Sequence, residues 1–82
     1  MPRYFFDIDD GDRFTIDEEG SECAGPSAAR DEAMAVLPAI AKDMAPSRDN
    51  RTITASVRDE RGRTLFRATL ALTSQWLGPS PV

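Results

Sequence analysis

The side chains of this sequence that could do chemistry together are carboxylates near its start. Asp7, Asp9 and Glu18 match positions one, three and twelve of a calcium-binding loop, which holds the ion through oxygen ligands. The sixth position of such a loop requires glycine, but this sequence has Asp12 there, and strands rather than helices are predicted on both sides. The match is therefore weak. We expect a solvated turn, and a loose cation site at Asp9, Asp10 and Asp12 is the alternative.

Acid–base and nucleophilic catalysis have little support in the composition. The chain has no histidine and one cysteine, so the usual pairs of nucleophile and base are missing. Cys23 follows an acidic stretch, and nearby carboxylates disfavour the reactive thiolate. A single cysteine also excludes an internal disulfide and a cysteine-based metal site. We predict that the protein is not an enzyme and binds no cofactor, metal or small-molecule substrate.

Hydrophobic periodicity predicts the elements that position these side chains: a β-hairpin at 3–17, a helix at 26–45 and a second hairpin at 51–77. Gly25 or Ser27 can cap the helix, and in the first case Pro26 is its first residue. Pro38 interrupts the pattern, so we expect a kink, with two shorter helices broken near Leu37 as the alternative. The apolar stripe that defines the helix consists of Ala33, Val36, Leu37, Ile40, Ala41 and Met44.

The strands are predicted from alternation of apolar and polar residues. Residues 3–8 carry aromatic side chains on both faces, which favours a central position in a sheet. Gly11 allows the following turn, and a short second strand contains Phe14 and Ile16. The second hairpin pairs residues 52–58 with 63–73 through a turn that ends at Gly62. We predict one α+β domain over residues 1–77, a four-stranded, mainly antiparallel sheet with one helix on one face (β-β-α-β-β), and a disordered tail at 78–82.

One helix can cover only one face of this sheet. The side chains predicted to pack against it are Phe6, Ile8, Phe14, Ile16, Ile53, Val57, Phe66, Leu70 and Leu72. Trp76 and Leu77 are expected to fold over an open end of that core. The opposite face would carry Phe5, Thr15, Thr54, Ser56, Arg58, Leu65, Arg67 and Thr69. We expect partners to bind an unpaired edge strand or this face, where the candidate residues are Phe5, Arg58, Leu65, Arg67 and Thr69.

The charge is acidic overall and unevenly distributed. Fourteen acidic and ten basic side chains give a formal charge of −4, which disfavours nonspecific attraction to nucleic acid or anionic lipid. Residues 7–22 are acidic and residues 48–67 are rich in arginine. This pattern is typical of two solvated hairpins that attract each other weakly, and a two-pole partner site is the alternative. Since the sequence shows neither a signal-peptide core nor a membrane span, we expect a cytoplasmic protein without membrane contact.

Several segments together resemble a known family. They are Met1-Pro2-Arg3-Tyr4-Phe5-Phe6-Asp7, Asp17-Glu18-Glu19-Gly20, Ala28-Ala29-Arg30 and Val57-Arg58-Asp59-Glu60-Arg61-Gly62. This combination, which covers the chain to about Leu72, is similar to a bacterial family of short proteins grouped as a domain of unknown function. The resemblance implies a compact stand-alone domain and assigns no activity and no site residue.

By elimination, we predict a small noncatalytic module for protein interaction or regulation. Its partner would be another protein or a second copy of the chain, because a homodimer would enlarge the small core that 82 residues can form. The alternative is a weak binder of single-stranded nucleic acid that uses Phe5, Arg58 and Arg67 on the sheet face opposite the helix. The acidic net charge and the missing RNA-binding motif count against it.

Overall fold

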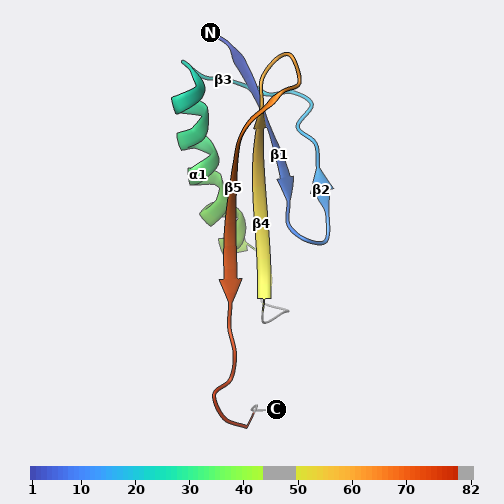
Figure 1. Ribbon diagram of the computed structural model, residues 1–82, viewed down its shortest axis with the longest axis vertical. Coiled ribbons are helices and arrows are strands. Elements are labelled where there is room, and N and C mark those ends of the chain that lie inside the picture. The colour runs from blue at the N-terminus through green and yellow to red at the C-terminus, as the bar shows by residue number, and fades with distance from the viewer. Residues whose placement is uncertain (44–49, 80–82) are drawn as a thin grey trace.

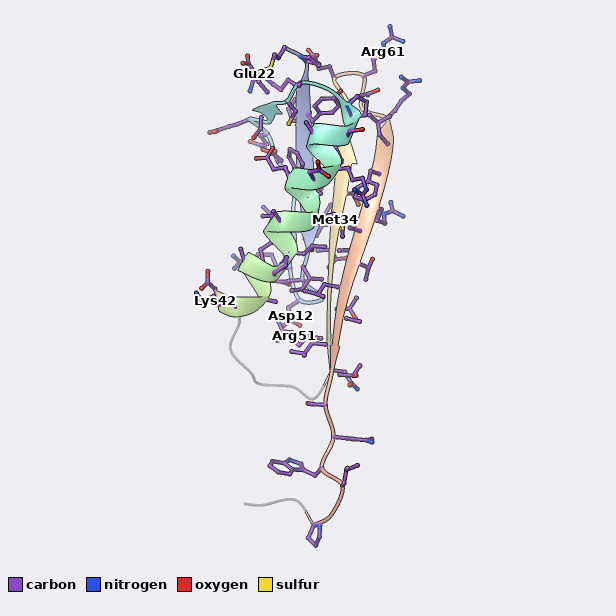
Figure 2. The ribbon with its side chains drawn as sticks, turned by 90° about the vertical axis from the view of Figure 1, so that its left-hand side faces the viewer. Asp12, Glu22, Met34, Lys42, Arg51 and Arg61 are labelled. Carbon is purple, nitrogen blue, oxygen red and sulfur yellow. The ribbon has the colours of Figure 1, made fainter. Side chains whose placement is uncertain are left out.

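The computed structural model, in which residues 1–43 and 50–79 are described, has the predicted α+β fold. Its strands are β1 (Arg3–Asp9), β2 (Phe14–Thr15), β3 (Ser21–Glu22), β4 (Asn50–Arg58) and β5 (Thr64–Thr73), and its helix is α1 (Pro26–Asp43). Figures 1 and 2 show α1 against one side of the sheet. Beside the four predicted strands, the two-residue β3 pairs with the start of β1. Residues 80–82 of the predicted disordered tail lie outside the described residues.

The first strand, β1, lies in the centre of the sheet, as its aromatic residues on both faces predicted. The strand order is β2-β1-β4-β5, with antiparallel pairing throughout this path, and β3 pairs antiparallel with β1 as well. One edge of β1 therefore contacts β4, while the other contacts β2 and β3 in succession. Within the described ranges, β5 ends the sheet and its outer edge pairs with no strand.

The helix begins where the sequence predicted and continues through its internal proline. The backbone N–H of Ala29 donates to the carbonyl oxygen of Gly25 at 3.1 Å, which makes Gly25 the residue that precedes the first turn. The chain stays helical past Pro38, so the alternative of two helices broken near Leu37 is wrong. Leu37 is buried against the sheet, and this packing holds the helix together where Pro38 removes one hydrogen-bond donor. The predicted helix end, at residues 44–45, lies outside the described residues.

The core lies between α1 and the sheet and is made largely of small side chains. Ala29 and Ala33 of α1 are almost completely buried, which lets the helix backbone approach the strands closely. The buried hydrophobic residues of this core are Tyr4, Cys23, Ala29, Ala33, Leu37, Ile53, Ala55, Val57 and Ala68. Phe6, Ile8, Phe66 and Leu70 pack around them and are only partly buried, so part of the predicted core is confirmed.

The side chains of β2 lie on the opposite faces from those predicted. Phe14 lies opposite Asp9 and Thr15 opposite Ile8, and directly paired residues share one face of a sheet. Thr15 therefore lies on the helix side and Phe14 on the other side, so two predictions are wrong: that Phe14 and Ile16 join the core, and that Thr15 lies on the face opposite the helix. Both are exposed, at 61% and 57%. A shift of one residue in so short a strand exchanges its two faces, and the turn before it decides the shift.

The far end of the β4–β5 hairpin is less covered than predicted. β1 pairs with β4 only as far as Thr54, so residues 50–53 of β4 pair with β5 alone. Leu72 and Trp76 remain 60% and 64% exposed, and Leu77 is 90% exposed. The prediction that Leu72 packs under the helix and that Trp76 and Leu77 close the core is therefore wrong.

The β4–β5 turn contains two irregularities that set the positions of side chains in β5. Gly62 has a φ of +86° and donates to the carbonyl oxygen of Asp59 at 3.0 Å, in agreement with the predicted glycine turn. A bulge follows, because Val57 pairs with Phe66 whereas Arg58 pairs with Thr64. Leu65 is thus left without a directly opposite residue, and the alternation that the sequence suggested for it is interrupted.

Candidate functional site

The sheet surface opposite α1, here called the open face, contains four of the five residues predicted to bind partners. Its composition follows from the register: Phe5 lies opposite Arg58, Asp7 opposite Ser56 and Ser56 opposite Arg67. Thr69 lies opposite Thr54, and their hydroxyl oxygens are 3.2 Å apart. A shallow hollow of about 400 Å³ in this face is lined by Asp7, Asp9, Phe14, Thr54, Ser56, Thr64 and Arg67.

Arg58 is the most extensively bonded side chain of the open face. Its Nε and Nη2 atoms donate to the two carboxylate oxygens of Asp7 at 2.6 and 3.1 Å, and Nη2 also donates to the carbonyl oxygen of Asp17 at 3.0 Å. The guanidinium carbon lies 5.0 Å from the centre of the Phe5 ring, in cation–π geometry. Arg58 and Phe5, two of the residues predicted to bind nucleic acid, therefore contact each other.

The Asp7 carboxylate is buried, with 6% of the residue exposed. The hydrogen bonds from Arg58 lower the pKa of Asp7, while its burial acts in the opposite direction. The same hydrogen bonds to Asp7 raise the pKa of Arg58. Both groups stay ionised near neutral pH, and they form an internal ion pair rather than two free charges.

Asp17 takes the place of a strand residue between β2 and β3. Its Oδ2 accepts the backbone N–H of Phe6 at 3.0 Å, and its own N–H donates to Oδ1 of Asp7 at 3.0 Å. Its Oδ1 accepts the N–H groups of Glu19 and Gly20 at 3.1 and 3.0 Å. Burial raises the pKa of Asp17, but the N–H donors of Gly20, Phe6 and Glu19 outweigh it, so the pKa is lowered. The Asp-Glu-Glu-Gly segment is thus a loop in which the Asp17 side chain accepts a backbone hydrogen bond from β1, as the backbone of a neighbouring strand would.

We expect the free energy of unfolding to fall as the pH decreases below about 4. Asp7 and Asp17 have folded-state pKa values below the ordinary value of 3.8, so their stabilisation is complete above that pH and is lost as the pH falls through the folded values. Asp17→Asn should make this pH dependence shallower and lower stability at pH 7, whereas Glu18→Gln at the neighbouring exposed residue should do neither. Urea denaturation between pH 2.5 and 7 measures both, and an equal effect of the two variants would contradict the role of Asp17.

In the acidic turn at residues 9–13, the carboxylates of Asp9 and Asp10 accept hydrogen bonds from the backbone of the turn itself. Oδ1 of Asp9 accepts the N–H of Gly11, and Oδ1 of Asp10 accepts those of Asp12 and Arg13, all at 2.7–2.9 Å. The hydrogen bonds from the N–H groups of Arg13 and Asp12 lower the pKa of Asp10. Asp12 forms an ion pair with Arg51 at 3.8 Å, and Figure 2 shows the two side by side. In the part of the chain that the structure describes, no three His, Cys, Asp or Glu side chains are grouped so as to hold a metal ion.

Cys23 is buried between β3 and α1. Its thiol donates to Oε2 of Glu32 at 3.3 Å. Burial raises the pKa of Cys23, and the Glu32 carboxylate raises it further. The protonated thiol is favoured, which agrees with the direction predicted from the acidic stretch.

Leu65, the fifth predicted residue, lies away from the open face. Because of the bulge it lines an apolar pocket of about 200 Å³ between the start of α1 and β5, together with Tyr4, Pro26, Ser27, Ala29, Arg30, Val57 and Phe66. The guanidinium carbon of Arg30 lies 5.8 Å from the centre of the Phe66 ring. Sequence reasoning missed this pocket because the bulge that forms it interrupts the alternation of β5.

Besides the open face, the outer edge of β5 is an exposed surface that could bind a partner. The strand has ten residues, with the sequence TLFRATLALT, in which Arg67 is the one charged residue and proline and glycine are absent. The edge-strand prediction named no residues, since strand order does not follow from the sequence. The low charge of the last strand could have indicated this edge in the sequence. Edge strands usually carry charged residues or proline, which prevent pairing with another chain, and this strand has one charge.

These features define a small antiparallel α+β domain with an uncovered sheet edge and an apolar pocket beside it. The chain belongs to the family described as "Domain of unknown function (DUF6894)", whose model matches residues 3–71. This confirms the predicted membership of a family without an assigned activity. Neither a curated protein nor a solved structure matches the chain significantly. Among the described residues, no helix is long and apolar enough to cross a membrane.

Proposed function

We propose that the protein is a noncatalytic interaction module that binds a protein partner by strand addition at the outer edge of β5. The observation that carries the proposal is the ten-residue length of this edge, with Arg67 as its one charge. An exposed edge presents a row of backbone donors and acceptors, and an extended partner segment can pair with them.

The edge of β5 is preorganised for pairing with such a partner. Pairing with β4 keeps it extended on both sides of the bulge at Leu65, and Phe66, Ala68 and Leu70 pack toward α1. The partner would therefore meet a strand that is already ordered, which reduces the conformational entropy lost on binding. Side chains on the two faces would provide specificity, while the backbone would provide affinity.

The open face supports binding less well than the edge. Arg58 is paired with Asp7 and stacked on Phe5, and the hollow beside them contains the carboxylate of Asp9. The alternative function, weak binding of single-stranded nucleic acid, would therefore depend on Arg67 and the exposed ring of Phe14. These two residues line the same hollow.

A peptide with the sequence of β5, residues 64–73, is a direct probe of the proposed edge. We expect it to bind the full-length protein and to shift backbone amide NMR signals along β5, while those of Phe5 and Asp7, two strands away, stay in place. The control peptide carries proline for Ala68 and Thr69. Because adjacent residues direct their N–H groups to opposite edges, one of these prolines always removes a donor to the partner strand.

The proposal is overturned if the unmodified peptide does not bind, if the proline peptide binds equally well, or if the shifts fall on the open face. Binding of single-stranded RNA that weakens with salt and disappears in Arg67→Ala, without peptide binding, would replace it with the alternative function.

A further inference from the structure

The exposed apolar side chains at the end of the chain follow the direction of β5. Leu72 is 60% exposed at the end of the strand, and Trp76 is 64% exposed three residues beyond Thr73. Figure 1 shows the chain continuing past β5 in line with the strand before it turns. In an extended continuation of β5, Trp76 would lie on the same face as Phe66, Leu70 and Leu72, because side chains alternate.

The pocket beside the start of β5 fits an aromatic side chain. Its lining includes the partly exposed Leu65 and the ring of Phe66, and Arg30 lies over that ring. A tryptophan combines a large apolar surface with a ring that attracts a guanidinium group. Within one copy, Trp76 and this pocket belong to opposite ends of the ten-residue β5.

Antiparallel pairing of two β5 strands would bring these opposite ends together. In a two-fold pair, residues on the same face must lie opposite one another. With Ala71 on the two-fold axis, Leu70 lies opposite the partner's Leu72, and Phe66 lies opposite the partner's Trp76. Arg67 then lies opposite the partner's Gln75, so no two arginines meet across the interface.

We propose that the strand added to β5 is the β5 of a second copy of this chain, and that Trp76 of each copy enters the pocket of the other beside Leu65, Phe66 and Arg30. This inference rests on the proposed function, since it names the partner of the same edge. Trp76 lies beyond residues 3–71, which the family model matches. The two tryptophans would be the largest apolar contacts of the dimer, one at each end of the paired strands.

The single tryptophan of the chain reports on the proposed contact. We expect light scattering to show a dimer at micromolar concentration, and the fluorescence emission to move to shorter wavelength as the dimer forms. Trp76→Ala should raise the dimer dissociation constant by about 30-fold or more. Its unfolding at low concentration should be unchanged, because Trp76 is exposed in one copy. Leu77→Ala, at the neighbouring exposed residue, is the matched control and should leave the dimer intact.

The register is tested by disulfide formation in a Cys23→Ser background. Ala71→Cys should crosslink to its own copy, because a directly opposite pair has a Cα separation of about 4.5–5.5 Å, within disulfide range. Thr69→Cys should crosslink poorly, since its two copies lie about four residues, or roughly 13 Å, apart along the strands. Preferential crosslinking at Thr69→Cys, or a dimer whose emission is unchanged, overturns the tryptophan exchange and leaves strand addition standing. A monomer at all concentrations overturns self-association, and the peptide experiment then decides the proposed function separately.

Discussion

Gly20→Ala should lower the free energy of unfolding by about 3 kcal/mol or more. Gly20 has a φ of +74°, a conformation that side chains with a Cβ disfavour by about 1–2 kcal/mol. A Cβ atom at this position would also lie 2.9 Å from the carbonyl oxygen of Tyr4 and 2.8 Å from Cγ of Arg3. The carbonyl belongs to the central strand and cannot move without disturbing its pairing with β3. Urea denaturation at pH 7 measures the loss.

Gly62→Ala is the matched control for this prediction. Gly62 has a similar φ of +86°, but a Cβ there would meet no atom within 4 Å. Its substitution should cost only the backbone term of about 1–2 kcal/mol. The difference between the two variants isolates the close approach of the Asp17–Gly20 loop to β1. Equal losses would show that this approach contributes nothing.

Arg58→Met should destabilise the protein by about 2–4 kcal/mol, because it leaves the buried Asp7 carboxylate without its charged partner. It also removes the hydrogen bond to the carbonyl oxygen of Asp17 and the stacking on Phe5. Methionine keeps much of the apolar length of arginine, so the loss reports mainly on charge and hydrogen bonding. Thermal and urea unfolding provide the measurement.

The double variant Asp7→Asn/Arg58→Met tests whether the uncompensated charge causes this loss. Asparagine keeps an acceptor for the N–H of Asp17 but carries no charge, so the double variant should be more stable than Arg58→Met alone. The difference between wild type and Arg58→Met should also narrow as the pH falls, because protonation of Asp7 removes the charge in the variant. A double variant less stable than Arg58→Met would contradict the explanation.

If these predictions hold, the open face serves mainly to stabilise the fold. The acidic first hairpin and the arginine-rich second hairpin then attract each other through two ion pairs, the buried pair of Asp7 and Arg58 and the pair of Asp12 and Arg51. The proposed partner would then bind at the exposed β5 edge and the pocket beside Leu65.

Local patterns in the sequence determined the element types, the central position of β1, the start of α1 to within two residues and the glycine turn at Gly62. Each depends on neighbouring residues: aromatic side chains on both faces of 3–8, Gly25 and Pro26 before an apolar stripe, and a glycine after three polar residues. The family resemblance rested on the same local segments, and the family match confirms it.

Tertiary structure alone decided which residues meet. The face of Phe14 depends on the register of a two-residue strand, and the position of Leu65 depends on a bulge, which alternation in one strand cannot reveal. The roles of Asp7 and Asp17 required the loop before β3 to fold back along β1, because a carboxylate becomes structural only when distant N–H groups and a guanidinium surround it. The uncovered edge of β5 likewise follows from strand order, a property of the assembled sheet that no single strand carries.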